Sequence, residues 1–448
     1  MWAQYMAYTT ISKGKKPRQL FITKNDILRK EVEKSFGNMG LAWRRHQNSE
    51  DSSNAQSDEQ PDSTSLEQKS KFPLFLTSNE WLDIIDKELP GESFFTDKEI
   101  DERAYFRNSE DDTVQRVVEA LFTNENEAQA NDITRNEMNY KCFQKLWRKI
   151  NASQKSILDP AMVWREINTY IKGSVPALKV NDIERESPMH RFLSLQEYLA
   201  LPRKQSRLNQ EQRRIVYALY LMYEKVKKEK NYYDSMDIVY NLAGRMTRYL
   251  SSVTTAKVDA SYQHLLPFDS LYIDEVQDFT MSELYLLTKL SRDPNNLMLA
   301  GDTAQSIAEG VGFRFTDVRQ IFFNSFGGME PNLLQLTHNY RSHSGVLRLA
   351  ACVVELLYFF FNDSLDTLPP DLGLFDGPKP IIMEVPTAED LVLMLDGSKR
   401  ETSKIEFGAH QVVIVRNENA KGDLPDEFGV DKDWVMTVSR CSSPYHMY

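Results

Sequence analysis

The chain has 448 residues, of which 41% are apolar and 11% are aromatic, and its formal net charge is −11. This length allows roughly two to four domains, and the composition excludes a wholly disordered, collagen-like or disulfide-stapled protein. The acidic balance argues against a protein that coats nucleic acid without sequence preference, because such a protein needs a basic surface to displace counterions. The acidic net charge is still compatible with a local basic groove.

The cysteines are few and far apart, at Cys142, Cys352 and Cys441, so we expect neither a disulfide framework nor a zinc module. An intracellular, reducing location is the expectation, with nucleus and cytoplasm both open. The N-terminal residues lack an apolar core for a signal peptide. The most apolar stretch, 351–361, contains Glu355 and is shorter than the ~18–20 residues that a bilayer requires, so we expect no membrane span.

In chain order, an apolar run at 18–23 precedes apolar residues at helical spacing over 27–36, which predicts a strand, a loop and a helix. The stretch 46–68 is rich in Ser, Asp, Glu, Gln and Asn and has no aromatic, Lys or Arg residue. Such a stretch cannot bury enough surface to offset the entropy of ordering, so it predicts a flexible insert or linker.

From about residue 72 to 250 the pattern is helical, with Trp and Leu recurring at three and four residues. Within this region, residues 203–230 hold nine Lys or Arg against three Asp or Glu, interleaved with Tyr217, Tyr220 and Tyr223. Two interpretations stay open: a solvated helix face, or an arm that contacts phosphates.

After Pro267 the pattern changes to strands alternating with helices, which favours a mostly parallel sheet with helices on its faces. Thr280 and Glu283 have the spacing of a capping box and predict a helix that runs through Leu290. The strands are predicted at residues 271–273, 297–300, 333–336 and 412–415.

Polar residues follow three of these apolar runs, at 274–278, 301–306 and 339–342. In parallel sheets, ligands bind at the carboxyl ends of the strands. Asp274 can hold a hydrated Mg²⁺ ion, and Glu275 can orient or deprotonate a water molecule. A neighbouring Gln can sense that water or a terminal phosphate, and an Arg can neutralise developing charge. The pattern is typical of phosphoryl transfer from a nucleoside triphosphate.

The segment Ile273-Asp274-Glu275-Val276-Gln277-Asp278 resembles the Walker B motif of UvrD/Rep-like superfamily 1 helicases. Residues 300–307, which read AGDTAQSI, are similar to the following motif of that family, and 336–342, LTHNYRS, resemble its NYRS motif. Residues 20–23 resemble the motif before the helical insertion. The closest resemblance is to the helicase-like region of large eukaryotic tetratricopeptide- and ankyrin-repeat proteins.

This resemblance implies an α/β fold: a RecA-like, P-loop NTPase-type parallel sheet with a large helical insertion and a partial second RecA-like domain. The implied segments are the start of the first RecA-like domain at 1–45, a disordered linker at 46–71, a 1B-like helical insertion at 72–263, the rest of the first domain with Walker B at 264–332, and a truncated second domain at 333–448.

The resemblance also implies roles for residues. Asp274 would coordinate Mg²⁺ and, with Asp302, belong to the ATP site; Glu275 would be the catalytic carboxylate. Gln305 would contact the γ-phosphate and the attacking water, and Arg341 the γ-phosphate from the second domain. Gln277, Asp278 and Tyr340 would couple nucleotide to strand movement; the alternative for each is a structural role at a domain seam. The candidate nucleic-acid contacts are Thr23, Arg203, Lys204, Arg207, Arg213 and Arg214.

A P-loop of the form G-x-x-x-x-G-K-[ST] is missing, because no Gly-Lys-Ser or Gly-Lys-Thr occurs in these residues. The KGLEF motif of the family is absent as well. We therefore expect an ATP hydrolase of the helicase type by family, with ATP and Mg²⁺ as cofactors, but a chain that is a fragment or isoform and inactive by itself. The alternative is a non-catalytic module of the same fold that binds single-stranded nucleic acid or protein.

Overall fold

The computed structural model describes residues 17–48, 72–96, 135–178, 192–203, 205–255, 268–291, 293–305, 312–360, 368–382, 413–415 and 435–437. Of the segment predicted as a flexible linker, only the residues up to Asn48 are described, and they end a helix. The rest of that segment lies outside the described residues. Within the described ranges, no helix is both long and apolar enough to cross a membrane.

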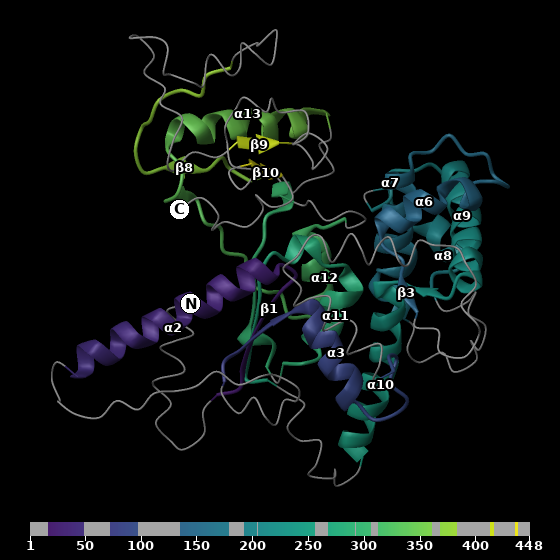
Figure 1. Ribbon diagram of the computed structural model, residues 1–448, viewed down its shortest axis with the longest axis horizontal. Helices are drawn as coiled ribbons and strands as arrows, with labels where there is room; N and C mark the ends of the chain where they lie inside the picture. Colours follow the sequence, from purple (N-terminus) through teal and green to yellow (C-terminus); the bar gives the residue numbers. More distant parts are fainter. Residues whose placement is uncertain are drawn as a thin grey trace. The chain divides into compact units, whose positions relative to one another are not determined.

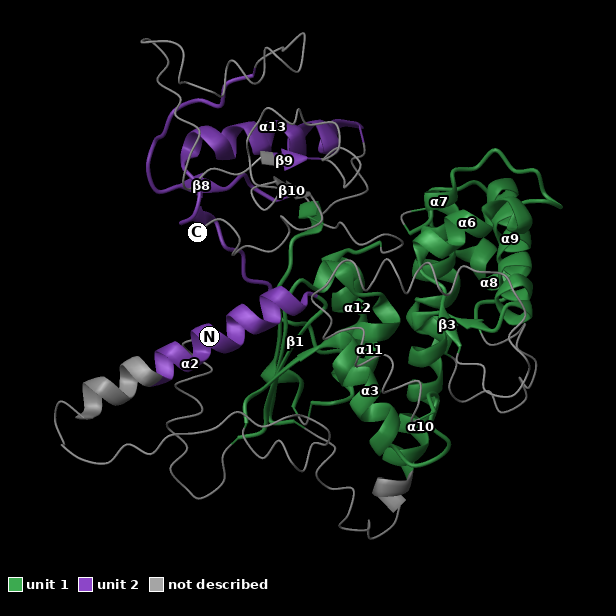
Figure 2. Ribbon diagram, in the orientation of Figure 1, with its two compact units in different colours: residues 1–24, 51–332 green, residues 25–50, 333–448 purple. Residues whose placement is uncertain are grey.

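The chain divides into two compact units, shown in different colours in Figure 2. Unit 1 comprises Met1–Lys24 and Asp51–Asn332, and unit 2 comprises Asn25–Glu50 and Leu333–Tyr448. The long segment of unit 2 begins at the residue where the sequence suggests a second domain. The helix after the first strand belongs to unit 2, whereas the sequence analysis places it in the first domain.

Unit 1 is built on a parallel sheet of four strands in the order β2-β1-β5-β6. The strands are β1 (Gln19–Thr23), β2 (Leu74–Thr77), β5 (Ser270–Ile273) and β6 (Leu297–Leu299). The predicted α/β class with a parallel sheet is confirmed, as are the strands predicted at 18–23, 271–273 and 297–300.

Strand β2 corrects one prediction, because it lies where the sequence pattern indicates helix from residue 72 onward. Its four residues are all buried, as are all five of β1. A strand that is covered on both faces reads as a continuous apolar run without period-two alternation, so a run this short does not distinguish strand from helix.

Capping boxes start the helices that follow two of the strands. Thr77 caps α3 (Ser78–Glu88), with Glu80 returning a bond to the cap backbone. Thr280 and Glu283 do the same for α11 (Met281–Thr288), which confirms the predicted helix start, although the helix ends two residues before Leu290. In unit 1, α3 packs beside β1 and β2 (Figure 1).

The helical part of unit 1 lies between β2 and β5 in the chain. Its elements are β3 (Asn136–Glu137), α6 (Tyr140–Ile150), α7 (Pro160–Arg165), the π-helix η1 (Glu166–Lys172), η2 (Val175–Leu178), α8 (Leu195–Ala200), α9 (Gln210–Glu229), β4 (Tyr232–Tyr233) and α10 (Ser235–Thr255). After β5 come η5 (Val276–Asp278), α11, η6 (Pro294–Asn296), β6, η7 (Thr303–Gln305) and α12 (Phe315–Ser325).

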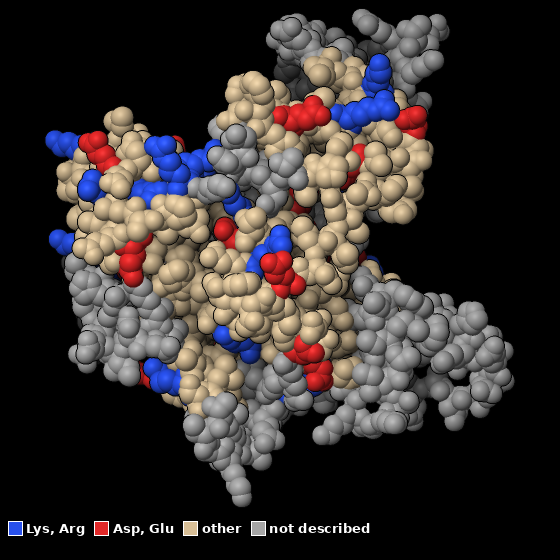
Figure 3. Space-filling view, turned by 180° about the vertical axis from the view of Figure 1, so that it is seen from behind, with Lys and Arg blue, Asp and Glu red and all other residues tan. Residues whose placement is uncertain are grey.

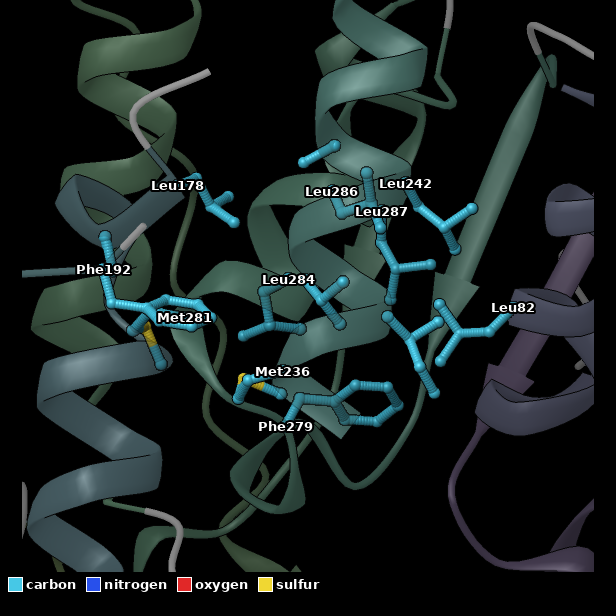
Figure 4. Close-up of a cluster of buried hydrophobic side chains, with 14 of the residues drawn as sticks. Leu82, Leu178, Phe192, Met236, Leu242, Phe279, Met281, Leu284, Leu286 and Leu287 are labelled. Carbon is cyan, nitrogen blue, oxygen red and sulfur yellow. The ribbon is translucent and has the colours of Figure 1, made fainter. Parts of the chain in front are cut away.

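One continuous apolar core joins the sheet helices to the helical part. Figure 4 shows Leu82 of α3, Leu242 of α10 and Leu284 of α11 in the same buried cluster, with Phe279 beneath them. Each of these side chains is buried. Burying such a side chain contributes roughly 1.5–3 kcal/mol. The helical part is therefore anchored to the segment that follows the Walker B-like residues.

Unit 2 contains α2 (Asp26–Asn48), α13 (Ser344–Phe360) and two short parallel pairs (Figure 1). The pairs are β7 (His338–Asn339) with β8 (Leu372–Gly373), and β9 (Val413–Val415) with β10 (Val435–Thr437). The strand predicted at 412–415 is confirmed. The strand predicted at 333–336 is wrong, because no described strand pairs with this segment, and Leu334 and Leu336 are 87% and 90% exposed.

A buried ion pair ties α3 to α10. The guanidinium of Arg245 donates to the carboxylate of Asp86 and to the carbonyl oxygens of Asp86 and Leu89. Asp86 also accepts the backbone N–H groups of Phe94 and Phe95 at 2.7 and 2.9 Å. Both charged side chains are almost inaccessible to water. Removing one partner of such a pair leaves the other charge buried without compensation.

We expect Asp86→Ala to destabilise unit 1 by about 3–5 kcal/mol, because Arg245 would stay buried with its charge unpaired. Urea unfolding, followed by circular dichroism, measures this loss. Lys149→Ala is the control, since it breaks the ion pair with Glu229 on the exposed surface and should leave the unfolding midpoint unchanged. An Asp86→Ala protein as stable as the wild type would contradict the assignment.

Candidate nucleotide site at the strand ends

The parallel register brings the carboxyl ends of three strands to one edge of the sheet. Ile273 of β5 lies opposite both Ile22 of β1 and Leu299 of β6. The ladder continues beyond the strands, from Asp274 N to Ile22 O at 3.0 Å and from Val276 N to Ala300 O at 2.9 Å. The segment after β5 is therefore held between the ends of its two neighbours.

A sharp turn at Glu275 separates the two adjacent carboxylates. Glu275 has φ of 54° and ψ of 48°, in the left-handed region that is uncommon for residues other than glycine. Its backbone N–H donates to Oδ1 of Asp274 at 3.0 Å. A strained backbone of this kind persists where surrounding contacts fix it, and such positions cluster at functional sites.

Gln277 links the ends of β5 and β6. Its Nε2 donates to the Glu275 carboxylate, and its Oε1 accepts the backbone N–H of Asp302 at 3.0 Å. Gly301 makes this approach sterically feasible, because a Cβ there would lie 2.5 Å from Oε1 of Gln277 and 2.6 Å from Cγ2 of Val276. The structure thus gives Gln277 a contact with both strand ends.

Burial raises the pKa of both Walker B-like carboxyl groups, and neighbouring negative charge adds to this only at Glu275. Burial is the main cause for Asp274, where the Glu275 N–H acts in the opposite direction. Burial also raises the pKa of Glu275; the hydrogen bond from Gln277 lowers it, and Asp274, Asp278 and Asp302 raise it further. Four carboxyl groups therefore share this edge of the sheet, and a nearby cation would favour their ionised forms.

Asp302 and Gln305 lie at the end of β6. Asp302 accepts the Ala304 N–H at Oδ1 and the Gln305 Nε2 at Oδ2, both at 2.8 Å. Gln305 is exposed. The structure thus places the side chain of Gln305, the residue predicted to contact the γ-phosphate, on Asp302. Asp274, Glu275, Gln277, Asp278, Asp302 and Gln305 are all brought to the same sheet edge.

Tyr340 and Arg341 belong to unit 2. They follow β7 in a turn where Asn339 Oδ1 accepts the backbone N–H groups of Arg341 and Ser342 at 3.0 and 2.9 Å. Both side chains are exposed. The turn presents an arginine and a tyrosine to solvent.

The candidate nucleic-acid contacts divide by exposure. Arg203, Arg207 and Arg214 are exposed, whereas Lys204 lies outside the described residues. Thr23 is fully buried in β1. Tyr217, Tyr220 and Tyr223 are buried in the core as well, so they do not form an exposed aromatic surface between the basic residues.

Arg213 is a correction to the predicted set. Its side chain is 3% exposed, and its guanidinium donates to the carbonyl oxygens of Tyr198, Leu199, Leu201 and Ser206. These bonds hold the end of α8 and the loop after it against α9. Arg213 therefore has a structural role, because its NH1 and NH2 groups are already bonded to these carbonyl oxygens.

Sequence patterns miss the contacts of η1 with both strand-end segments. Thr169 Oγ1 accepts the N–H of Gly312, which follows the β6 segment, at 3.0 Å. Gly173, directly after η1, accepts the Ser282 N–H at 2.8 Å, and a Cβ on Gly173 would lie 3.0 Å from that of Thr280. A π-helix has no distinct residue pattern, so no signal in the sequence identifies this junction.

We expect Glu275→Gln to raise the free energy of unfolding at pH 7–8. The raised pKa of Glu275 means that its ionised form is disfavoured in the folded state, so the wild type loses stability as the pH rises through that pKa. The variant lacks this loss, and its advantage should vanish below pH ~4.5, the ordinary range of a Glu carboxyl.

Urea unfolding from pH 4 to 8 tests this dependence. Glu211→Gln, on the exposed start of α9, is the matched control and should follow the wild type at every pH. An advantage of Glu275→Gln that is greatest at pH 4 would contradict the electrostatic account.

Comparison with known proteins places the chain among helicases. Residues 78–322, more than half of its length, match the family described as UvrD/REP helicase N-terminal domain. The chain is 34% identical over 444 residues to the human TPR and ankyrin repeat-containing protein 1, which covers 92% of this chain and 14% of that protein.

Bacterial helicases are further relatives. Identity is 28% over 199 residues with the putative ATP-dependent DNA helicase YjcD of Bacillus subtilis (strain 168), covering 43% of this chain and 24% of that protein. It is 34% over 90 residues with DNA helicase II of Escherichia coli (strain K12), covering 20% and 12%. The chain thus spans a small part of each of these relatives.

Proposed function

Because this chain belongs to the UvrD/REP helicase N-terminal domain family, we propose that it carries catalytic carboxylates of an ATP-dependent motor that moves along nucleic acid. We further propose that its sheet is RecA-like, with residues 274–278 as the Walker B motif. The observation that carries the proposal is the strand-end geometry, in which Gln277 contacts both Glu275 and the β6 end.

The residues at this edge fit a magnesium ion. Mg²⁺ keeps several waters and is bound through one or two carboxylates together with substrate phosphates. Oδ1 of Asp274 accepts the Glu275 N–H, whereas Oδ2 has no hydrogen bond to any described residue. Asp274 would hold the ion, with Asp302 nearby. When bound with ATP, the ion supplies charge neutralisation at the phosphate oxygens.

Glu275 is the candidate general base for the attacking water. Its pKa is raised, which makes the carboxylate a better proton acceptor than an ordinary glutamate near neutral pH. The Gln277 amide holds the carboxylate in place. Release of Gln305 from Asp302 would let its amide reach the water or the γ-phosphate, and Arg341 would neutralise charge there.

Coupling to nucleic acid is proposed to start at Gln277, with Asp278 beside it and Tyr340 on unit 2. A change at the Glu275 carboxylate reaches the Asp302 backbone through a single side chain. Among the candidate nucleic-acid contacts, Arg203, Arg207 and Arg214 have exposed side chains and remain in the proposal, together with Lys204 outside the described residues.

We expect ATP to bind weakly to the 448-residue chain, because its sequence contains no Gly-Lys-Ser or Gly-Lys-Thr to cradle the phosphates. Each charge-assisted phosphate bond contributes about 1.5–3 kcal/mol, so the loss of several removes most of the affinity. Calorimetric titration with ATP, with and without Mg²⁺, measures this. Submicromolar binding would overturn the expectation and make the isolated chain a complete nucleotide site.

The catalytic assignment is tested in a longer protein that joins this chain to a phosphate-binding loop. Mg²⁺-dependent ATP turnover should fall by about 10²–10⁴-fold in Glu275→Gln, the range typical of a lost general base. Glu211→Gln is the control and should keep wild-type turnover. A Glu275→Gln protein that hydrolyses ATP at the wild-type rate would overturn the proposed function.

A further inference from the structure

Two lysines of the helical part are buried in an ionic cluster, whereas several of its other basic side chains are exposed. Lys172 and Lys227 are buried against the carboxylates of Glu224, Asp234 and Asp237, at 2.5–3.0 Å. This cluster places two ammonium groups among three carboxylates, so both positive charges are neutralised within it. The positive charges that stay uncompensated on the surface therefore lie elsewhere.

Helix α6 carries the densest of these exposed charges. Its 11 residues include four basic and no acidic side chains. Lys141, Lys145 and Arg148 are exposed and form no ion pair with any described residue, whereas Lys149 pairs with Glu229 at 2.8 Å. Figure 3 shows Lys and Arg side chains gathered on the part of unit 1 that holds α6, α7 and α9.

These three side chains form a row on a helix that is fixed in place. Spacings of four and seven residues place them on one face of the helix, with Lys141 and Arg148 about 10 Å apart along its axis. The opposite face is fixed in the core, where Phe143 contacts Trp164 and Tyr223 with ring centroids 5.0 and 5.8 Å apart. The row cannot turn away from solvent without breaking these contacts.

Helix stability explains only part of this charge. Arg148 lies in the last turn, where a cation interacts favourably with the helix dipole. Lys141 lies in the first turn, where the dipole disfavours a cation and favours Asp or Glu, and that turn contains no acidic residue. The Lys141 charge therefore does not stabilise the helix and is accessible to an external anion.

We propose that the α6 row, defined as Lys141, Lys145 and Arg148, binds the phosphate backbone of single-stranded nucleic acid. The inference rests on the proposed function and identifies a surface that would contact the nucleic acid. A row of cations along a fixed axis matches a polymer with regularly repeated charge. A membrane fits less well, because the apolar residues Phe143 and Ile150 of α6 are buried and the helix exposes no large apolar side chain.

Anisotropy of a fluorescent oligothymidylate, titrated with the chain over a range of salt concentrations, tests the row. Each phosphate contact on a single strand contributes about −0.7 to the slope of log K against log salt. Replacing all three residues of the row by Gln should therefore reduce the slope by about 2. The matched control removes three exposed charges outside α6: Lys87→Gln, Arg248→Gln and Arg319→Gln.

The outcomes separate the row from the proposed function. A triple variant that keeps the wild-type slope, while the chain binds the oligonucleotide, overturns the row and leaves the motor proposal standing. If the control variant shows an equal reduction in the slope of log K against log salt, the effect reflects net charge alone. That result also overturns the assignment of the row. Polyglutamate or anionic vesicles that compete equally per charge overturn the assignment to nucleic acid. The Glu275→Gln turnover assay judges the catalytic proposal independently.

Discussion

The parallel register of β1, β5 and β6 is the constraint on which the candidate site depends. Ile22, Ile273 and Leu299 are aligned across the sheet, so the chain leaves all three strands at the same edge. Carboxylates that are separated by many residues along the chain then become neighbours without any long-range ion pair to hold them. Their mutual repulsion is tolerated because the ladder bonds to Ile22 and Ala300 fix the backbone.

Local signals predict the parts of the structure that local chemistry controls. The Thr280–Glu283 capping box and the apolar runs of β5 and β6 are visible in the sequence, because each depends on neighbouring residues alone. The sequence does not reveal that Arg213 and the three tyrosines of α9 are buried. Their burial depends on the packing of α8 and α6 on α9, which residue patterns within α9 do not reveal. A basic residue there can cap carbonyls as readily as bind phosphate.

The site itself shows the same division. Asp274 and Glu275 can be identified from their place after a strand, but the left-handed turn at Glu275 and the two-sided contact of Gln277 require the β6 end, which only the folded sheet supplies. Net charge is uninformative for a similar reason. The total of −11 is a sum that includes both a buried ionic cluster and an exposed basic helix. Only the positions of these charges in the folded chain show which of them can meet a ligand.

The π-helix η1 has a consequence for how insertions and deletions would act on this protein. A π-helical turn holds one more residue than an α-helical turn, and each residue of an α-helix advances the side chains by about 100°. Deleting one residue from Glu166–Lys172 would let the segment relax into an ordinary helix, at no loss of helical hydrogen bonding. The same deletion would rotate Thr169 or Gly173 out of register with Gly312 and Ser282. The helical part could then stay folded while losing its mechanical connection to the strand ends.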